Sequence, residues 1–132
     1  MRKYSKLIRK GIFEPLPNVQ FHGKAPLKRF LLLDSKLAPN SNMRVAAHII
    51  TKLPKRIPKY CQLHYHKFDE INLILSEKGK LKYRVCLEDE EYTVSSPATV
   101  YIPKGMRHSQ EVISGHGIFV VILMAKKYKA LI

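Results

Sequence analysis

Two short segments of the chain carry the residues best suited to chemistry. HYHKFDE places His64 and His66 one residue apart, and Glu70 follows four residues after the second histidine. PKGMRH ends in His108. Imidazole is a borderline ligand and carboxylate a hard one, so such groups suit Mn, Fe, Co, Ni, Cu or Zn. A His-x-His pair also occurs by chance on exposed strands, so an ordinary polar hairpin is the alternative.

The first segment has the pattern of a strand followed by a tight turn and a second strand. Successive strand side chains point to opposite faces, so His64, His66 and Gln62 share one face. The two histidines then lie roughly 6.6–7 Å apart along the strand. Cys61 points to the other face, where we expect a small apolar residue and not a nucleophile. Glu70 begins the next strand and can face back toward the histidines.

The second segment adds a histidine whose direction is defined by a turn. Proline fixes its own φ and glycine tolerates a positive φ, so Pro103 and Gly105 predict a turn. His108 follows that turn at the start of a strand. The turn can therefore aim His108 in a defined direction, which favours a metal site over a polar hairpin.

The elements that must position these residues are short strands. β-branched and aromatic residues recur in short runs, and eight prolines are spread along the chain. Such runs at roughly 8–12-residue spacing predict an antiparallel sandwich or barrel. The strands are expected at residues 28–34, 44–51, 60–66, 70–76, 81–87, 91–94, 98–102, 108–113 and 117–124.

With both motifs in order and strands between them, the chain resembles a single-domain, RmlC-like cupin over about residues 42–125. HYHKFDE is similar to the His-x-His and Glu of the first cupin motif, and PKGMRH to the Pro-x-Gly-x-x-His of the second. The resemblance implies an all-β antiparallel double-stranded β-helix, or jelly-roll barrel. It also implies that one divalent transition metal (Mn, Fe, Co, Ni or Zn) binds to His64, His66, Glu70 and His108. Such a site leaves room for one or two waters or substrate atoms.

The departures from the cupin motifs remove none of the implied ligands. Pro58 and Pro97 stand where the motifs begin with glycine, and both positions serve turns. Gly79 comes two residues later than the family glycine, which preserves the alternation of both strands. Val112 replaces the terminal asparagine of the second motif and so removes a polar group from the ligand-bearing face.

Three amides share the predicted ligand-bearing faces. Alternation places Gln62, Asn72 and Gln110 there, where they could line the pocket or hydrogen-bond the ligands. The alternative is a position at the barrel rim, in contact with water.

The remaining histidines and two tyrosines have structural expectations. His48 lies on a strand that should flank the site, and we expect a satisfied histidine of the barrel. His22 and His116 lie in loop-like stretches with glycine neighbours, which predicts surface positions. Tyr83 and Tyr101 are expected to be packing residues.

The net charge of +14 is unevenly distributed. Residues 1–60 hold fourteen Lys/Arg and two acidic residues, whereas residues 61–132 hold ten and eight. Such basicity can attract nucleic acid, an acidic surface or anionic metabolites. The basic residues are spread through several strands and turns, without interleaved stacking aromatics. We therefore do not expect nucleic acid as a partner; binding with a steep salt dependence is the alternative.

The chain is expected to be a cytoplasmic protein that does not associate with membranes. The N-terminus lacks the apolar core of a signal peptide, and the longest apolar run, residues 117–125, is too short for a membrane-spanning helix. Two cysteines make neither a disulfide framework nor a zinc ribbon. We expect a basic N-terminal arm over residues 1–25 and a cupin barrel over residues 26–132. Apolar outward positions and the arm predict a homodimer.

Two classes of function follow from the resemblance. The first is a small metalloenzyme of the isomerase, decarboxylase or dioxygenase type, acting on a small polar or anionic metabolite. The second is a non-catalytic cupin that binds or senses a small molecule. The sequence contains no obvious general base besides the implied ligands, which is compatible with the second class. Turnover of a metabolite would separate the two.

Overall fold

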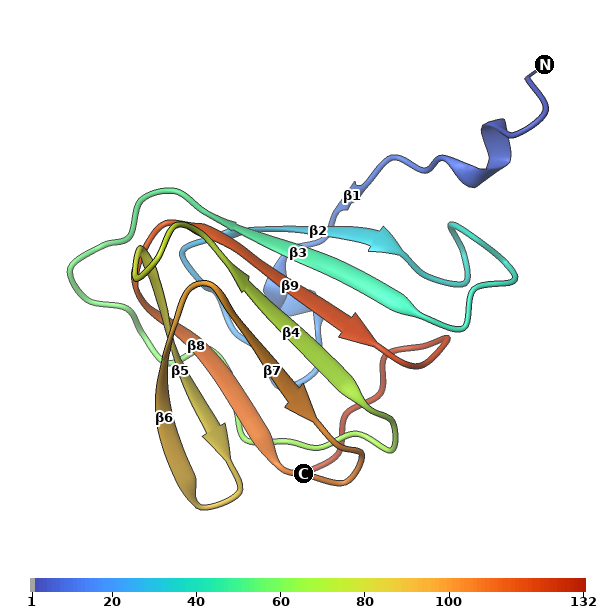
Figure 1. Cartoon of the computed structure of the whole chain (residues 1–132). Helices are drawn as coiled ribbons and strands as arrows, with labels where there is room; N and C mark the ends of the chain where they lie inside the picture. Colours follow the sequence, from blue (N-terminus) through green and yellow to red (C-terminus); the bar gives the residue numbers. More distant parts are fainter. Residues whose placement is uncertain (1) are drawn as a thin grey trace.

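The computed structural model describes residues 2–132 and consists of two antiparallel β-sheets that face each other (Figure 1). The larger sheet has six strands in the order β1-β2-β3-β9-β4-β7, and the smaller has three in the order β6-β5-β8. Within the described residues, no helix is long and apolar enough to cross a membrane. The strands are β1 (Ile12–Phe13), β2 (Lys28–Leu33), β3 (Arg44–Ile50), β4 (Glu70–Leu75), β5 (Leu81–Leu87), β6 (Glu90–Ser95), β7 (Ala98–Ile102), β8 (His108–Gly115) and β9 (Gly117–Leu123).

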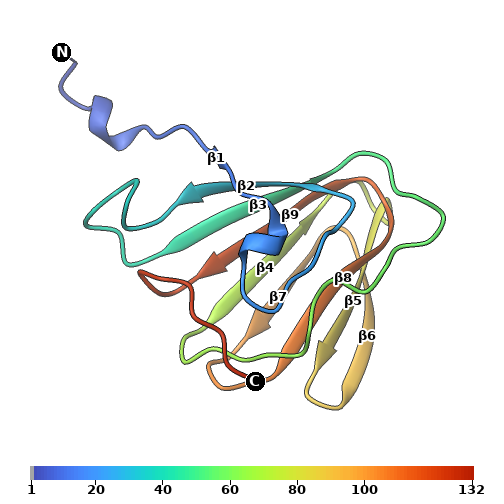
Figure 2. The same ribbon diagram turned by 180° about the vertical axis from the view of Figure 1, so that it is seen from behind.

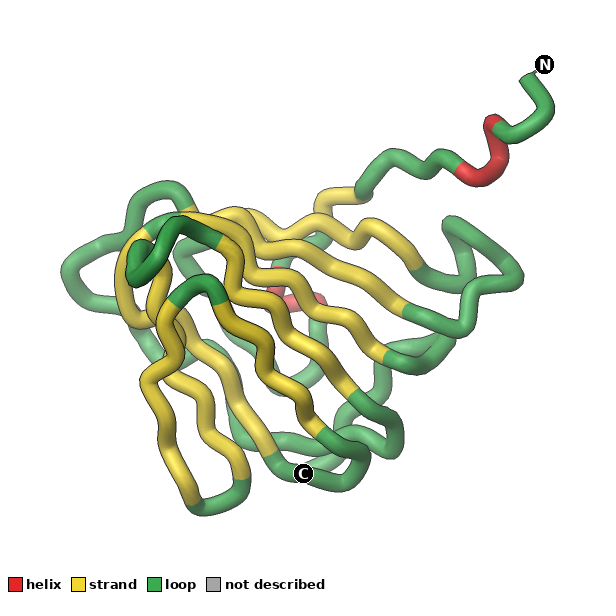
Figure 3. The backbone as a smooth tube through the Cα atoms, in the orientation of Figure 1, coloured by secondary structure: helices red, strands yellow, loops and turns green. Residues whose placement is uncertain are grey.

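The all-β, antiparallel jelly-roll prediction is confirmed (Figure 3). Eight of the nine expected strands form within two residues of their expected bounds. The exception is residues 60–66, which make isolated bridges to three different segments instead of one continuous strand. Because the partner changes along this segment, the alternation of faces fails: Tyr60 and Cys61 are both buried, whereas Gln62 and Leu63 are both exposed.

The chain passes repeatedly between the two sheets. It leaves the larger sheet after β4, returns to it at β7, enters the smaller sheet again at β8 and comes back at β9. In the larger sheet β9 pairs with both β3 and β4, so strands distant in sequence become neighbours. Side chains that point inward from both sheets therefore meet between them. Glu70 on β4 and His108 on β8 can thus lie close together.

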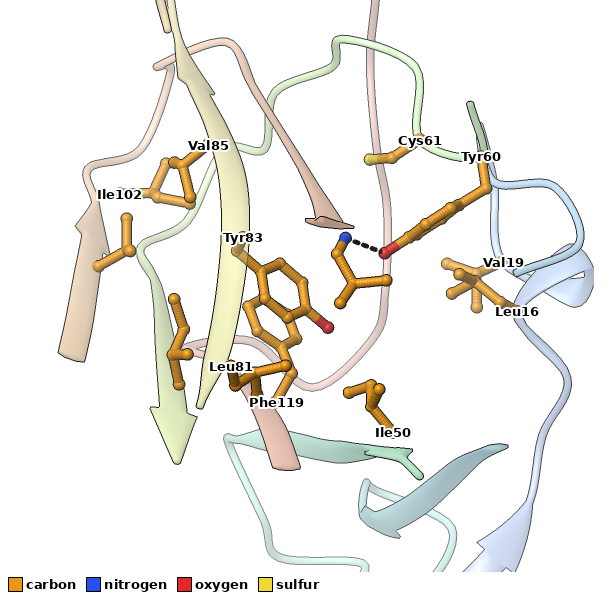
Figure 4. Close-up of a cluster of buried hydrophobic side chains, with 13 residues drawn as sticks. Leu16, Val19, Ile50, Tyr60, Cys61, Leu81, Tyr83, Val85, Ile102 and Phe119 are labelled. Atoms are coloured by element: carbon orange, nitrogen blue, oxygen red, sulfur yellow. Dashed lines mark hydrogen bonds between the residues drawn. The ribbon is translucent and has the colours of Figure 1, made fainter. Parts of the chain in front are cut away.

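The space between the sheets is filled by an apolar cluster (Figure 4). The ring of Tyr83 stacks on Phe119 with 4.2 Å between centroids and 11° between planes. The backbone N–H of Val112 donates to the Tyr60 hydroxyl at 2.7 Å, so this polar group is satisfied inside the core. Tyr83 is therefore a packing residue, as expected. The cluster consists of Leu16, Val19, Ile50, Tyr60, Cys61, Ile74, Leu81, Tyr83, Val85, Val100, Ile102, Val112 and Phe119.

The N-terminal segment joins the barrel earlier than residue 26. Residues 2–11 are exposed and extend away from the sheets (Figure 2). β1 then pairs with β2, and the residues that follow cross in front of the larger sheet in the view of Figure 2. Leu16 and Val19 are buried there in the apolar cluster. The expected arm over residues 1–25 thus combines a projecting segment with a second part that completes the core.

Strand β4 offers a direct test of this core. The Ile74 side chain is fully buried, whereas that of the next residue, Leu75, is 42% exposed. Ile74→Ala should lower the free energy of unfolding by about 2–5 kcal/mol, because it removes buried methylenes and leaves a cavity. Leu75→Ala should cost less than about 1 kcal/mol. Urea denaturation would measure both, and equal losses would contradict the assigned facing of β4.

Candidate metal centre

A pair of backbone hydrogen bonds joins the two segments that carry the histidines. The N–H of His64 donates to the carbonyl of His108 at 3.1 Å, and the N–H of His108 donates to the carbonyl of His64 at 2.8 Å. The N–H of Gly105 donates to the carbonyl of His66 at 2.7 Å. These bonds hold the segment 64–66 beside the start of β8. His64 and His108 are therefore directly opposite each other, with 4.5 Å between ring centroids.

The turn before β8 has the form that the sequence predicts. The N–H of Met106 donates to the carbonyl of Pro103 at 3.1 Å, and Gly105 has φ +85°. There is open space around a Cβ at this glycine, so glycine is needed here for its backbone conformation. Asp69 holds the turn from outside, since its carboxylate accepts from the Lys104 N–H at 2.9 Å and the Tyr101 hydroxyl at 2.8 Å.

Tyr101 therefore differs from the expectation of a packing residue. Its side chain is largely exposed, and its hydroxyl bonds to the residue that precedes Glu70. This contact ties the start of β4 to β7 and to the turn that leads to His108.

The three histidines and Glu70 converge between the sheets. One ring nitrogen from each of His64, His66 and His108 lies within 4.8 Å of the others, and all three side chains are buried. Glu70 Oε1 lies 3.2 Å from His66 Nε2 and 3.3 Å from His108 Nε2. Four residues from two motifs thus occupy one small region, although 44 positions separate the first from the last in the sequence.

Each histidine is oriented by a hydrogen bond at its other ring nitrogen. Nδ1 of His64 lies 2.7 Å from the Gln62 carbonyl, Nδ1 of His66 2.6 Å from the Lys129 carbonyl, and Nδ1 of His108 2.9 Å from the Met106 carbonyl. A carbonyl only accepts, so each Nδ1 carries the proton. In neutral imidazoles the lone pair then lies on Nε2, as in metal-bound histidines.

Two amides orient the carboxylate in the same way. Glu70 Oε2 accepts from Asn72 Nδ2 at 2.8 Å and from Gln110 Nε2 at 2.8 Å. Gln110 Nε2 also donates to Asn72 Oδ1 at 2.6 Å. This network saturates Oε2 and leaves Oε1 facing the imidazoles. Asn72 and Gln110 are therefore brought to the site.

Gln62 lies elsewhere. Its side chain is exposed and is not part of the cavity lining, so it takes the alternative position in contact with water and does not line the pocket. The irregular backbone of residues 60–66 is the reason, because a regular strand would have kept it on the face of His64. Its backbone carbonyl, however, orients the His64 ring.

The unpaired Nε2 atoms provide a test of fit to a metal. His66 Nε2 and His108 Nε2 are buried and form no hydrogen bond, although both lie close to Glu70 Oε1. Each Nε2 lies near Glu70 Oε1, but neither pair of atoms forms a hydrogen bond. Buried polar atoms without a partner are costly. Three nitrogens and one oxygen around a shared centre fit a first-row divalent ion.

Protonation states at the site follow from burial and from Glu70. Burial lowers the pKa of His64 to about 3, so this imidazole is neutral near pH 7. Burial alone would raise the pKa of Glu70, but the nearby His108 and His66 rings and the Asn72 amide lower it below its usual range. Burial alone would lower the pKa of His108, but its contact with Glu70 raises it. Glu70 thus favours a positive charge at this point, either a proton on His108 or a metal ion.

The side chains of His64, His66 and Glu70 line a cavity that opens to solvent. The lining comprises Leu16, Val19, His22, Arg29, Arg44, Ala46, His48, Tyr60, His64, His66, Glu70, Gln110, Phe119, Val121, Leu123 and Tyr128.

Two of the other histidines differ from their expectations. His48 is buried in the cavity wall, and its Nδ1 has no hydrogen-bond partner among the described residues, so it is not a satisfied histidine. His22 is half-buried beside His64, with 5.3 Å between ring centroids, and does not lie on the surface. A bridge between His22 and Cys61 brings it there, and such long-range pairing has no local signal. His116 is exposed, as expected.

Several residues around the cavity carry no motif in the sequence. Arg29, Arg44 and Tyr128 enter the lining from segments without a motif. Glu111 accepts from the N–H groups of Tyr60 (2.7 Å) and Cys61 (3.3 Å), and so supports the segment that leads to His64. Arg29 could have been noticed as a charged residue within an otherwise apolar strand run.

The comparisons with known proteins concern the fold. No family model matches the sequence, and no curated protein matches it significantly. KdgF from Halomonas sp. is similar in structure, with a TM-score of 0.59 at 10% identity, over 89% of this chain and 88% of that one. The polyketide cyclase RemF from Streptomyces resistomycificus has a TM-score of 0.56 at 15% identity, over 99% and 84%.

A third similar structure is a variant of Bacillus subtilis oxalate decarboxylase, with a TM-score of 0.54 at 15% identity. The match covers 89% of this chain but 30% of that enzyme, so the chain corresponds to less than a third of its length. These three neighbours are cupin-fold proteins, and the chain has the cupin fold. Identities this low establish the fold alone.

Cys61 allows a test of the site's surroundings. Its thiol is buried beside His22, and burial raises its pKa to about 12. At pH 8 only about one molecule in 10⁴ should carry the thiolate, which is the reactive form. Iodoacetamide should therefore label Cys61 far more slowly than the half-buried Cys86, and unfolding in urea should remove the difference. Mass spectrometry of peptides would measure this; rapid labelling of native Cys61 would show that it is an accessible nucleophile.

Proposed function

We propose that this cupin-fold chain binds one divalent transition metal ion (Mn, Fe, Co, Ni or Zn) through His64, His66, Glu70 and His108. The observation that carries the proposal is the buried His66 Nε2 and His108 Nε2 without hydrogen-bond partners, next to a carboxylate oxygen. The three Nδ1–carbonyl bonds support it, because they orient each ring with Nε2 toward the centre.

We further propose that the chain is a small metalloenzyme acting on a small polar or anionic metabolite. A bound divalent ion would supply Lewis-acid chemistry of the kind that isomerases, decarboxylases and dioxygenases use. The protein's part is to hold Glu70 ionised through Asn72 and Gln110, and to bind the metabolite in the cavity. An open cavity beside the cluster supports a reactive site over a sealed structural one.

The second candidate is a cupin that binds or senses a small molecule without turnover. The apolar part of the cavity wall, which includes Val121 and Leu123, favours this function. Besides the arginines, the other titratable groups of the lining are His22, His48, Tyr60 and Tyr128. Burial lowers the pKa of both histidines and raises that of both tyrosines, away from the values that suit proton transfer near pH 7. Incubation of metal-loaded protein with a metabolite mixture, followed by mass spectrometry, distinguishes the two: loss of a metabolite supports the enzyme, and retention without loss supports the binder.

We also propose that the protein is a cytoplasmic homodimer. Tyr4, Leu7 and Ile8 on the projecting segment are 64–80% exposed, and Ile12 and Phe13 on the edge strand β1 are 49% and 58% exposed. Unpaired edges and exposed apolar side chains are hazardous for a protein that stays a monomer. A second copy of the chain would cover both.

Metal binding can be tested by titrating chelator-treated protein with Mn, Fe(II), Co, Ni and Zn under calorimetry. We expect near-stoichiometric binding of at least one ion, and a higher melting temperature because the ion binds the folded state. His66→Ala and His108→Ala should each lose most of the metal while keeping the fold, since each removes a ligand and the core is apolar elsewhere. Exposed His116→Ala is the matched control and should bind as the wild type does.

The metal proposal fails if no ion binds near stoichiometrically, or if His108→Ala binds as well as the wild type. HYHKFDE would then be a polar segment whose Glu70 forms a buried ion pair with His108.

Dimerisation can be tested by removing residues 2–11. The cut spares Leu16 and Val19, which belong to the core. The shortened chain should keep its melting temperature within a few degrees but form a weaker dimer, because it lacks the exposed apolar side chains. Light scattering across micromolar concentrations measures this. A full-length Leu7→Ser/Ile8→Ser variant should weaken the dimer too, and a monomeric wild type would refute the proposal.

A further inference from the structure

The cavity contains a buried guanidinium whose donors are mostly unused. Arg29 on β2 is 4% exposed and lines the same cavity as the histidine cluster. Its Nη2 lies 3.3 Å from Glu14 Oε1. Its Nε and Nη1 have no hydrogen-bond partner among the described residues. A buried charged group with unpartnered donors is unfavourable, so these donors favour an occupant of the cavity that supplies acceptors.

The acidic residues nearby are already engaged. Glu14 Oε1 is shared between Arg29 and Arg44, whose Nη2 lies 3.1 Å from it. Asp34 Oδ2 lies 3.6 Å from Arg44 Nη1. Its Oδ1 accepts from the backbone N–H groups of residues 36 and 37 at 3.0 and 2.9 Å. Neither carboxylate contacts Nε or Nη1 of Arg29.

The neighbouring wall is also deficient in acceptors. Arg29 and His48 are directly paired across β2 and β3, and His48 Nδ1 has no partner within the described chain. The Nε of Arg44 is buried and unpartnered as well. Burial and the adjacent Arg29 lower the pKa of His48, so it remains a neutral imidazole that can donate or accept one hydrogen bond. The free groups of this wall are therefore mostly N–H donors, beside a fixed positive charge.

We infer that Arg29, with His48 beside it, forms an anion subsite that receives the carboxylate of a small organic acid bound in the cavity. This deepens, and rests on, the proposed function, because it names the chemical class of the metabolite. A planar carboxylate matches the guanidinium fork and can accept from two of its N–H groups at once. Water satisfies single donors, whereas a carboxylate satisfies two donors of the planar fork with one group.

The position of the subsite explains how such a ligand would be oriented. Arg29 and His48 come from β2 and β3, whereas Glu70 and His108 come from β4 and β8. All but His108 are part of one lining, and His108 lies against Glu70. A small acid held by its carboxylate on Arg29 would present its other end toward the histidine cluster. Apolar residues of the wall, such as Val121 and Phe119, then suit a short hydrocarbon portion.

The test uses calorimetric titration of the full chain with acetate, oxalate, malonate and succinate. Malonamide and phosphate serve as a neutral and a tetrahedral comparison. Each titration is run on metal-free and on metal-loaded protein, so that the anion subsite and the metal site are scored separately. The variant is Arg29→Met, with exposed Arg56→Met as the matched control because it removes the same charge. Metal content and melting temperature are measured for every variant.

We expect at least one of the carboxylates to bind, malonamide not to bind, and Arg29→Met to weaken carboxylate binding at least about tenfold. Metal content should be unchanged in Arg29→Met, and Arg56→Met should behave as the wild type. If Arg29→Met does not fold, Arg29→Lys replaces it; this variant keeps the charge but loses the planar fork, and should bind less tightly than the wild type.

Three results would overturn the inference: no carboxylate binds, phosphate binds and the carboxylates do not, or carboxylate affinity is unchanged without Arg29. Carboxylate binding that depends on Arg29 in a protein that takes up no metal would instead support the subsite and refute the metal proposal. Metal uptake with carboxylate binding independent of Arg29 would do the reverse.

Discussion

The reciprocal hydrogen bonds between the backbones of His64 and His108 are the constraint on which the site depends. They fasten a segment of irregular structure to the first residue of β8. With the bond from Gly105 to His66, they set the spacing of all three imidazoles. Residues 60–66 have no continuous strand partner, so these bonds fix the position of the segment relative to β8. The positive φ of Gly105 is what allows the turn to reach back to His66.

The site also depends on the stabilisation of the buried Glu70 carboxylate. A carboxylate in the interior is costly unless hydrogen bonds and positive charge compensate it. Here Asn72 and Gln110 satisfy one oxygen, and the imidazoles lie against the other. The amides come from β4 and β8, so the same two strands that supply Glu70 and His108 also fix the orientation of the carboxylate. The apolar cluster around Tyr83 and Phe119 carries the packing between the sheets.

A second group of charged side chains lines the cavity from β2 and β3. Arg29 and Arg44 share Glu14, which comes from the residues just after β1. The N-terminal segment therefore does more than project from the barrel: it brings a carboxylate to the arginines and two apolar side chains to the core. This connects the basic half of the chain to the cavity, and part of its positive charge lies inside the protein instead of on an exposed arm.

The sequence by itself determined most of the strands, the all-β class and the two motifs that carry the candidate ligands. Asn72 and Gln110 lie beside Glu70 because β4 and β8 are regular strands, and a two-residue period then sets which face a side chain occupies. The local signal at Pro103 and Gly105 likewise predicted the turn before His108.

Only the tertiary structure decided the rest of the site. Gln62 left the predicted face because residues 60–66 change partners along their length, and alternation holds only within one ladder. His22, His48 and Arg29 entered the cavity through pairings between segments far apart in the chain. Such pairings depend on which sheet edges meet, and no local pattern of residues encodes that. The residue types and spacing therefore predicted which side chains could bind a metal, while the packing of two sheets decided what else surrounds them.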